Sequence, residues 1–509
     1  QAPMLDAEVA AGRLPPVEQR LPRREDIQVV RPRESVGRYG GSISYNATNP
    51  NSFGNIGWSA MDVHLTGLTT NWEEVFPDLA RSVELSPDSR VATIRLRRGT
   101  RWSDGTPFTA DDILFWYKDI VSNPELPPMP AAFMVGGQRA VVAKVDEATV
   151  TFTFAAPNPG FALTLARVDP GMPLAPMHYL KKWHKTYNPD ADAVARQEGF
   201  TSWVNAFLAH MNGQTQENQV DAKLPVLKPW MLQGIDTFGN ATYVRNPYFW
   251  KVDTEGNQLP YIDRQMRMLI SDMEVVKLNV QGGKLDYADK FNIADLPVLK
   301  AGEAGGGYTT MLYPADLGAI RKYQFNLTVA DPGLRAVFND VRFRQAMSLA
   351  VNRKEINDTI YFGLGVPRQW GVSSKSPFYE EWEGQYFAAY DTAKAGALLD
   401  EAGLKKGPNG MRLRPDGQPL KLILSDAVGS TALSELIAEY WRKVGVDTQL
   451  NVTTREAFAQ SLQKGDIQAS VWFADVVSEK DMYSRPIWFR PPYGLDTNPV
   501  GGGLAWREW

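Results

Sequence analysis

Apolar and polar residues alternate along several segments in the first half of the chain. Residues 80–85 and 91–96 alternate on either side of a polar turn at 86–89, and residues 141–154 repeat the pattern around Asp146. A period of two places successive side chains on opposite faces of a strand, with one face buried and the other in water. These segments therefore predict two antiparallel hairpins in a β-rich region.

In the second half the spacing of apolar residues changes to about 3.6, the period of an amphipathic helix. Residues 340–350 and 430–444 show this spacing, and a further helix is predicted over 391–403, between a capping aspartate and a terminal glycine. Asn352 is typical of another helix cap, and residues 445–452 have a strand pattern. The alternation of helices with strands predicts an α/β lobe.

Composition narrows the classes of function. The chain has 509 residues, too many for one hydrophobic core, and it contains no run of 18 apolar residues that would span a membrane. Its net charge is −4 without a basic block, which argues against a nucleic-acid partner. There is no cysteine and there are four histidines, against 15 Trp, 19 Tyr and 22 Phe. These aromatic side chains favour contact with organic surfaces over acid–base or metal chemistry.

The residues with the strongest resemblance to catalytic or metal-binding groups have simpler structural interpretations. Asp111 and Asp112 follow Thr109 in a capping box, where carboxylates pair with the free N–H groups at the start of a helix. His178 and His184 lie six residues apart, without a partner at helical spacing or a thiolate. No catalytic residue, cofactor or metal ligand is predicted.

Several motifs occur in the order found in one protein family. The most extensive is Leu96–Asp112, with the sequence Leu-Arg-Arg-Gly-Thr-Arg-Trp-Ser-Asp-Gly-Thr-Pro-Phe-Thr-Ala-Asp-Asp. The others are Phe76–Ala80, Leu174–His178, Arg245–Trp250 with Leu259–Asp263, Asp340–Arg353 and Gly363–Gly365. Together they resemble family 5 of the extracellular solute-binding proteins (cluster C). These are binding components of ABC importers for peptides, nickel complexes and some oligosaccharides.

The resemblance implies an α/β fold of the periplasmic-binding-protein type II, with two main lobes joined by a hinge and an additional β-rich lobe. The expected parts are an extended N-terminal arm at 1–38, lobe I at 39–60 and 190–270, the β-rich lobe at 61–189, lobe II at 271–480, and a crossover back to lobe I at 481–509. Members of the family usually continue further, so the chain is expected to stop short of a complete C-terminal part.

One motif concerns the ligand. The segment Ala469–Asp475 resembles the family sequence W-x-A-D. In peptide-binding members this resemblance implies that the aspartate, here Asp475, accepts hydrogen bonds from the α-ammonium group of the peptide. The aromatic residues before it, Trp472 and Phe473, would form part of a side-chain pocket. The family pattern continues Y-P-D-P, whereas this chain has Val-Val-Ser-Glu-Lys-Asp. The partner of Asp475 therefore stays open.

Other features favour a sugar. The arm and residues 248–260 resemble a branch of the family that includes oligosaccharide binders. Tryptophans occur in or beside loops, where an indole face suits the C–H face of a pyranose; alternatively, they fill interfaces between lobes. The expected ligand-binding residues are Tyr45, Asn46, Trp58, Trp370, Trp472, Phe473, Asp475 and Trp488.

The sequence thus predicts an extracytoplasmic solute-binding protein of an ABC transporter. It would capture an oligosaccharide, or alternatively an oligopeptide, by hinge closure and deliver it to the permease. It is expected to be a monomer without enzymatic activity. The start Gln1-Ala2-Pro3 is interpreted as a mature chain after removal of an export signal, with a shortened chain as the alternative. A carbohydrate-active enzyme, a chaperone and a sensory receptor are the competing hypotheses.

Overall fold

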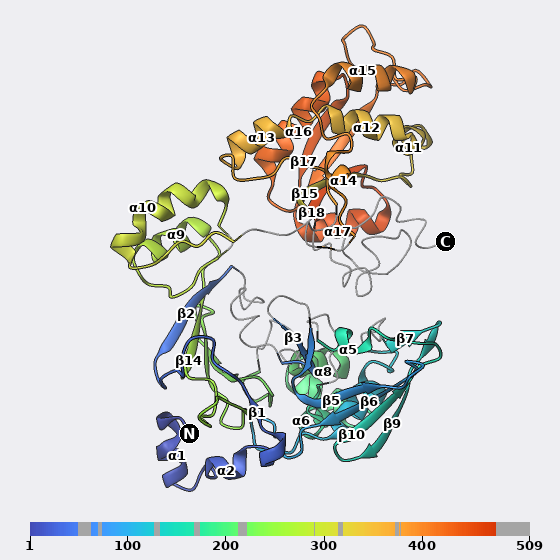
Figure 1. Cartoon of the computed structure of the whole chain (residues 1–509). Helices are drawn as coiled ribbons and strands as arrows, with labels where there is room; N and C mark the ends of the chain where they lie inside the picture. The colour runs from blue at the N-terminus through green and yellow to red at the C-terminus, as the bar shows by residue number, and fades with distance from the viewer. Residues whose placement is uncertain are drawn as a thin grey trace. The chain divides into compact units, whose positions relative to one another are not determined.

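The computed structural model describes residues 1–48, 63–69, 74–126, 133–166, 174–211, 221–289, 291–313, 319–371, 376 and 378–474. The chain divides into two compact units. Unit 1 comprises Gln1–Phe291 and Asp295–Thr310, and unit 2 comprises Asn292–Ala294 and Met311–Trp509 (Figure 1). Within the described ranges, no helix has the length and apolar character needed to cross a membrane.

The β-rich part of unit 1 contains a four-stranded antiparallel sheet. Its strands lie in the order β5 (Ala80–Leu85), β6 (Val91–Leu96), β10 (Thr149–Thr153) and β9 (Val141–Asp146). Both predicted hairpins are therefore confirmed. Short strand pairs accompany the sheet: β3 (Thr66–Leu68) with β4 (Val75–Pro77), and β7 (Met134–Val135) with β8 (Gln138–Arg139).

Helices close the core over this sheet. The predicted capping box at Thr109 is present at the start of α4, and Ile113 is fully buried. The same core includes Ala191 and Trp203, because α7 and α8 pack on it. The boundary expected at residue 190 therefore falls inside one continuous core. The helices are α4 (Ala110–Phe115), the π-helical turn η3 (Trp116–Ile120), α5 (Phe161–Thr164), α6 (Met177–Leu180), η5 (Lys181–Trp183), α7 (Ala191–Gln197) and α8 (Trp203–Met211).

A second sheet in unit 1 consists of β11 (Trp230–Ile235), β12 (Ala241–Arg245), β14 (Arg264–Leu269) and β2 (Ser42–Ala47), in that order. Neighbours are antiparallel except β14 and β2, which run parallel. Its buried face carries Tyr243 and other apolar side chains. The sheet therefore joins a segment near the start of the chain to strands more than 180 residues later in the sequence.

The pair α9 (Met273–Gln281) and α10 (Leu296–Gly306) also belongs to unit 1, whereas the short η6 (Ile293–Asp295) before α10 lies mostly in unit 2. The backbone N–H and the hydroxyl of Ser44, on β2, donate hydrogen bonds of 2.7 and 2.8 Å to Asp286, which lies between these helices. Apart from Asn292–Ala294, unit 2 consists of Met311–Trp509.

Unit 2 is the predicted α/β lobe. Its sheet has the order β15 (Ala319–Phe325), β18 (Ala469–Ala474), β16 (Lys421–Asp426) and β17 (Asp447–Val452). The last three strands are parallel, and β15 is antiparallel to β18. The helices around this sheet in Figure 1 are α11 (Pro332–Asn339), α12 (Val341–Leu349), α13 (Arg353–Ile360), α14 (Glu381–Gln385), α15 (Thr392–Glu401), α16 (Thr431–Lys443) and α17 (Arg455–Lys464).

The helix signals in the second half are confirmed. The side chains of Asn352 and Asp391 accept backbone hydrogen bonds at the starts of α13 and α15. Gly403 has a φ of +79°, the left-handed conformation that follows a helix end. Phe338 and Phe343 are fully buried between the helices and the sheet. Local patterning was therefore sufficient to locate α12, α13, α15, α16 and β17.

The N-terminal arm is not extended. It folds into η1 (Pro3–Leu5), α1 (Asp6–Ala10), α2 (Val17–Arg20), η2 (Arg24–Asp26) and β1 (Gln28–Val29), which pairs in parallel with β13 (Lys251–Val252). Arg20 is completely buried, and its guanidinium donates to the carbonyl oxygens of Pro15 and Pro247 and to the side chains of Gln258 and Gln1. Local turns and buried polar anchors thus replace the expected extended conformation.

We expect the change Arg20→Gln to destabilise unit 1, because a shorter neutral side chain leaves buried carbonyl oxygens without donors. The cost should be about 2 kcal/mol or more, seen as a lower melting temperature and faster proteolysis of the arm. Arg24→Gln, at an exposed position of the same arm, is the matched control. Equal stability of the two variants would contradict the anchoring role of Arg20.

Candidate functional site

The strongest candidate site on unit 2 is the edge of its sheet at which the parallel strands β16, β17 and β18 end. Ligands of open α/β sheets bind beyond the carboxyl ends of the strands. Because β15 is antiparallel, its first residues lie at this same edge, with Ala319 paired to Ala474. Residues from four distant segments therefore meet there.

Arg321 lies on Phe473 at this edge. The pairing of β15 with β18 is irregular between Ala319 and Lys322, and such an irregularity changes the direction of a side chain. The guanidinium carbon of Arg321 is 4.4 Å from the ring centroid of Phe473. Its Nε donates to the hydroxyl of Ser430, the residue that precedes α16. The charged group is thus held against an aromatic face.

A second arginine faces the same aromatic pair. Arg455 is the first residue of α17, after the capping residue Thr454. Its guanidinium carbon lies 5.6 Å from the ring centroids of both Trp472 and Phe473. Arg321 is half-buried, whereas Arg455 is exposed to solvent. Two positive charges therefore lie against one aromatic surface.

Burial lowers the pKa of Arg321 below its usual value, and the positive charge of Arg455 acts in the same direction. Asp426 opposes the shift, but its own carboxylate is 1% exposed and accepts hydrogen bonds from the backbone N–H groups of Val428 and Ser430. The hydroxyl of Ser434 donates to it as well, at 2.9 Å. The carboxylate of Asp426 is therefore engaged in the loop and the start of α16.

The tryptophans expected to stack on a ligand differ in their surroundings. Trp472 is 6% exposed, and its ring is stacked on Phe458 of α17 at a centroid distance of 5.6 Å. A neighbour in the same unit therefore covers much of its surface. Trp370 is 37% exposed, with the ammonium group of Lys322 5.4 Å from its ring centroid. Trp370 has the more accessible indole for stacking.

The other expected ligand-binding residues are in unit 1 or outside the described chain. Tyr45 is 1% exposed, and its hydroxyl donates to the side chain of Gln265 at 3.3 Å; Asn46 is 5% exposed. Both lie on β2, inside the sheet. Trp58, Asp475 and Trp488 lie outside the described residues.

The sequence did not single out Arg321, Ser430 or Arg455. A local signal exists for Arg455, which follows a helix cap at the end of a predicted strand. Nothing local indicates Arg321, because its contact with Phe473 depends on strand pairing across about 150 positions of sequence. Only the tertiary structure brings these residues together.

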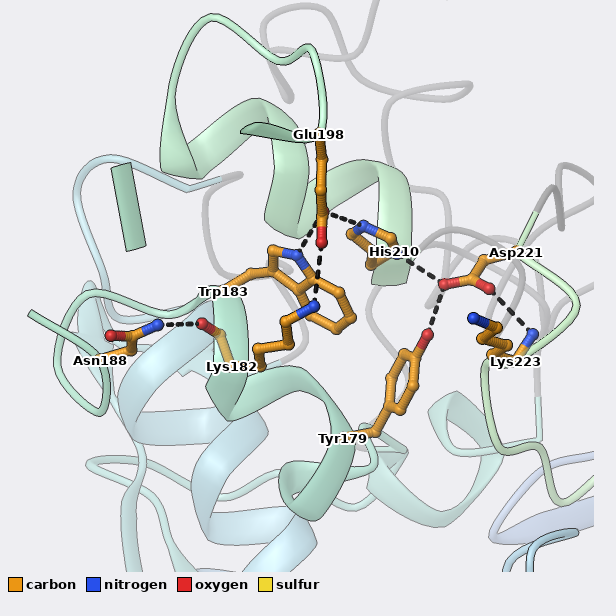
Figure 2. Close-up of polar contacts among 8 residues, drawn as sticks. All are labelled: Tyr179, Lys182, Trp183, Asn188, Glu198, His210, Asp221 and Lys223. Carbon is orange, nitrogen blue, oxygen red and sulfur yellow. Dashed lines mark hydrogen bonds and ion pairs between the residues drawn. The ribbon is translucent and has the colours of Figure 1, made fainter. Parts of the chain in front are cut away.

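Unit 1 contains a dense polar cluster around His210 (Figure 2). The imidazole lies between two carboxylates, with Nδ1 2.6 Å from Asp221 and Nε2 2.9 Å from Glu198. Its ring is stacked on Trp183 at 3.7 Å, and the indole N–H also donates to Glu198. The hydroxyl of Tyr179 donates to Asp221 at 2.6 Å. These polar groups bind one another and tie α8 to the segment that contains α6 and η5.

Both carboxylates of this cluster have lowered pKa values. For Glu198, burial acts to raise the pKa, but hydrogen bonds from Lys182, Trp183 and His210 outweigh it. For Asp221, burial is likewise outweighed, chiefly by hydrogen bonds from Tyr179 and His210. In the described part of the chain, no group of three His, Cys, Asp or Glu side chains has an arrangement that would hold a metal ion. The geometry is that of a structural cluster.

The capping interpretation of the acidic pair at α4 is confirmed for Asp112 but not for Asp111, whose carboxylate pairs with a lysine. Asp112 accepts hydrogen bonds from the backbone N–H groups of Thr109 and Met177, and burial raises its pKa. Asp111 forms an ion pair with Lys144 at 2.8 Å. Both carboxylates therefore have partners in the fold.

Residues 74–492 match the model of the bacterial extracellular solute-binding proteins, family 5. The chain is 27% identical over 485 residues to the periplasmic alpha-galactoside-binding protein of Rhizobium meliloti, covering 87% of this chain and 66% of that protein. It is 26% identical to the dipeptide-binding protein of Escherichia coli over 403 residues, covering 74% of this chain and 63% of that protein. The chain thus spans slightly less than two thirds of the length of these relatives.

Solved structures show the same fold. A structure named oligopeptide-binding protein OppA matches 98% of this chain and 78% of its own, at 34% identity and a TM-score of 0.71. The periplasmic binding protein MelB of Agrobacterium fabrum, solved in complex with stachyose, matches 98% of this chain and 77% of its own, at 23% identity and a TM-score of 0.71. These matches confirm the predicted periplasmic-binding-protein type II fold.

The polar cluster generates a prediction about acid stability. Because the pKa values of Glu198 and Asp221 are lowered on folding, the stability that they add is present above their ordinary values of 4.5 and 3.8 and is lost as the pH falls. We expect His210→Gln to lower the melting temperature at about pH 6 and to have a smaller effect near pH 3.

Thermal unfolding between these pH values measures the difference from the unmodified protein. Lys223→Gln is the matched control, since the backbone N–H of Lys223 bonds Asp221 and survives the substitution. A constant difference across the pH range would show that His210 does not act through the two carboxylates.

Proposed function

The chain belongs to the bacterial extracellular solute-binding proteins of family 5, and from this premise we propose that it is the solute-binding component of an ABC importer. It captures an organic solute outside the cytoplasmic membrane and delivers it to the permease. The observation that carries this proposal is the family match over residues 74–492, which extends through both units. Closure of a hinge around the ligand is the expected mechanism.

We favour an oligosaccharide as the solute. The named R. meliloti relative is an alpha-galactoside-binding protein and aligns with 87% of this chain. Trp370, on unit 2, keeps more than a third of its surface accessible, as an indole that stacks on a sugar must. The segment after Asp475 also lacks the Y-P-D-P sequence associated with peptide-binding members.

An oligopeptide is the second candidate. The structure named OppA is 34% identical to this chain over almost its whole length. Asp475 is retained at the position that, by resemblance, pairs with the ammonium group of a peptide. A buried ammonium needs such a partner, because an unpaired charge in a closed cleft is costly.

The remaining parts of the proposal follow from the same premise. The relatives are named as binding proteins, which supports binding without catalysis, and the R. meliloti protein is named as periplasmic, which supports an extracytoplasmic location. We propose a monomer that contacts the permease subunits. Turnover of an oligosaccharide by the pure protein would contradict the binding-only function.

Ligand screening should separate the two solutes. We expect di- to tetrasaccharides containing α-galactose to raise the melting temperature, because a ligand at 100 times its Kd adds about 2.7 kcal/mol to the free energy of unfolding. Di- to pentapeptides form the parallel series. Trp370→Ala should reduce the sugar effect without changing the fold, as judged by circular dichroism. Stabilisation by peptides alone would rule out the sugar hypothesis.

Binding should also compact the molecule. If ligand contacts on both lobes favour a closed state, small-angle X-ray scattering should give a smaller radius of gyration with the bound ligand than without it. Calorimetry under the same conditions establishes saturation. An unchanged radius at saturation would argue against hinge closure while leaving the binding function intact.

A further inference from the structure

We propose that β9 (Val141–Asp146) is a self-association surface, through which two copies of this chain pair in antiparallel fashion about a two-fold axis at Ala143. The partner is a second copy of the chain, and the contact joins the two β-rich sheets into one. This surface goes beyond the proposed function and takes no part in solute binding. The edge position of β9, its exposed side chains and the symmetry of their order support the pairing.

β9 is an open edge of the β-rich sheet. It is the last strand in the order β5, β6, β10 and β9, and within the described ranges it pairs with β10 alone (Figure 1). Val141 and Val145 are 67% and 63% exposed, and Ala143 between them is exposed as well. An edge strand presents unpaired backbone N–H and C=O groups, which are a template for a further strand. β9 therefore offers both backbone groups and apolar side chains to a partner strand.

Two other edge strands of unit 1 are protected. β5, at the opposite edge of the same sheet, has the charged residues Arg81 and Glu84 at its exposed positions. β2, at the edge of the second sheet, is covered, because its Ser44 donates backbone and hydroxyl hydrogen bonds to Asp286. Charged side chains and covering segments are the usual means of preventing contact between sheet edges. The exposed positions on one face of β9 are apolar instead.

The order of the side chains on β9 favours a second copy over an unrelated strand. Side chains two residues apart lie on one face of a strand, so Val141, Ala143 and Val145 share a face. Their order reads the same in both directions. In an antiparallel pair centred on Ala143, each valine lies opposite a valine of the other copy. Such cross-strand pairs stabilise a sheet, and a two-fold interface requires this self-complementarity.

The charge in the middle of β9 is compensated within each copy. Lys144 lies on the other face of the strand, and its ammonium group donates to both carboxylate oxygens of Asp111 at 2.8 Å. In the proposed register the two Lys144 side chains lie on the same face, two positions apart, where uncompensated ammonium groups would repel each other. Asp111, which does not cap α4, thus removes an obstacle to pairing.

Charges at the ends of the strand are complementary. The same register brings Arg139, the last residue of β8, towards Glu147 of the second copy, in the turn that follows β9. Both residues are exposed. The two-fold axis repeats this contact, so opposite charges flank the paired valines on each side.

The small size of the contact limits its strength. One pair of short strands buries less than the roughly 1,000 Å² that stable interfaces exceed. We expect a reversible dimer with a Kd of about 0.1 mM, so the monomer proposed above prevails in dilute solution. Static light scattering of the unmodified protein between about 10 and 500 µM measures this constant.

Cysteine substitutions test the register, because the chain itself contains no cysteine. Ala143→Cys places two thiols across the axis, and under mild oxidation it should give a disulfide-linked dimer, since opposed Cα atoms of antiparallel strands are about 4.5–5.5 Å apart. Val141→Cys and Val145→Cys should each stay monomeric alone, because equal positions lie about 14 Å apart along the strand. A mixture of these two variants should form dimers. Thr153→Cys, at an exposed position of β10, is the control that should not dimerise.

Charge substitutions test the surface without oxidation. Val145→Lys should raise the Kd about tenfold or more, because it places an ammonium group among the paired valines. Asp111→Asn should also raise it, by leaving Lys144 uncompensated. Val452→Lys, at a 58% exposed position of the edge strand β17 in unit 2, is the matched control and should leave the Kd unchanged. Circular dichroism and thermal unfolding establish that the variants are folded.

Absence of a dimer throughout the concentration range would overturn the proposal. So would crosslinking of Val141→Cys alone as readily as Ala143→Cys, or a dimer that Val145→Lys leaves intact, since either result places the contact elsewhere. Solute binding is measured separately at low micromolar concentration, where the chain is monomeric. Failure of self-association therefore leaves the proposed function in place, and failure of solute binding leaves the dimer in place.

Discussion

The position of β18 between an antiparallel and a parallel neighbour is the constraint on which the candidate site depends. Its parallel pairing with β16 directs its carboxyl end to the edge from which α16 and α17 begin. Its antiparallel pairing with β15 brings the start of that strand to the same edge. Backbone hydrogen bonds thus assemble Arg321, Ser430, Arg455 and Phe473, which no local segment contains.

The arginines at this edge have different surroundings from the arginines buried elsewhere in the molecule. Arg20 in unit 1 and Arg412 in unit 2 are buried, but carbonyl oxygens and polar side chains surround their guanidinium groups. Such arginines stabilise the fold, because their hydrogen bonds compensate for the lost hydration. Arg321, which is half-buried, and Arg455, which is exposed, instead lie against the ring of Phe473.

In unit 1, the polar cluster around His210 connects helices through hydrogen bonds. The imidazole of His210 lies between Asp221 and Glu198, and each carboxylate also accepts a hydrogen bond from an aromatic side chain. Asp112 is a similar case, because its carboxylate oxygens accept backbone hydrogen bonds at the start of α4. The carboxylates of these two clusters therefore hold helices in position.

The sequence by itself determined the features that depend on neighbours along the chain. Alternation over 80–96 and 141–154 was enough for the hairpins, and Thr109, Asn352 and Asp391 marked helix starts, because strands and caps are set by spacings of a few residues. The order of the motifs along the sequence was likewise enough to identify the family, because it does not depend on tertiary structure. The tertiary structure alone decided that α9 and α10 belong to unit 1, that Trp472 packs on Phe458, and that Arg321 meets Phe473. These contacts depend on which strands pair and which faces are buried, and pairing between distant segments has no signature in the local pattern.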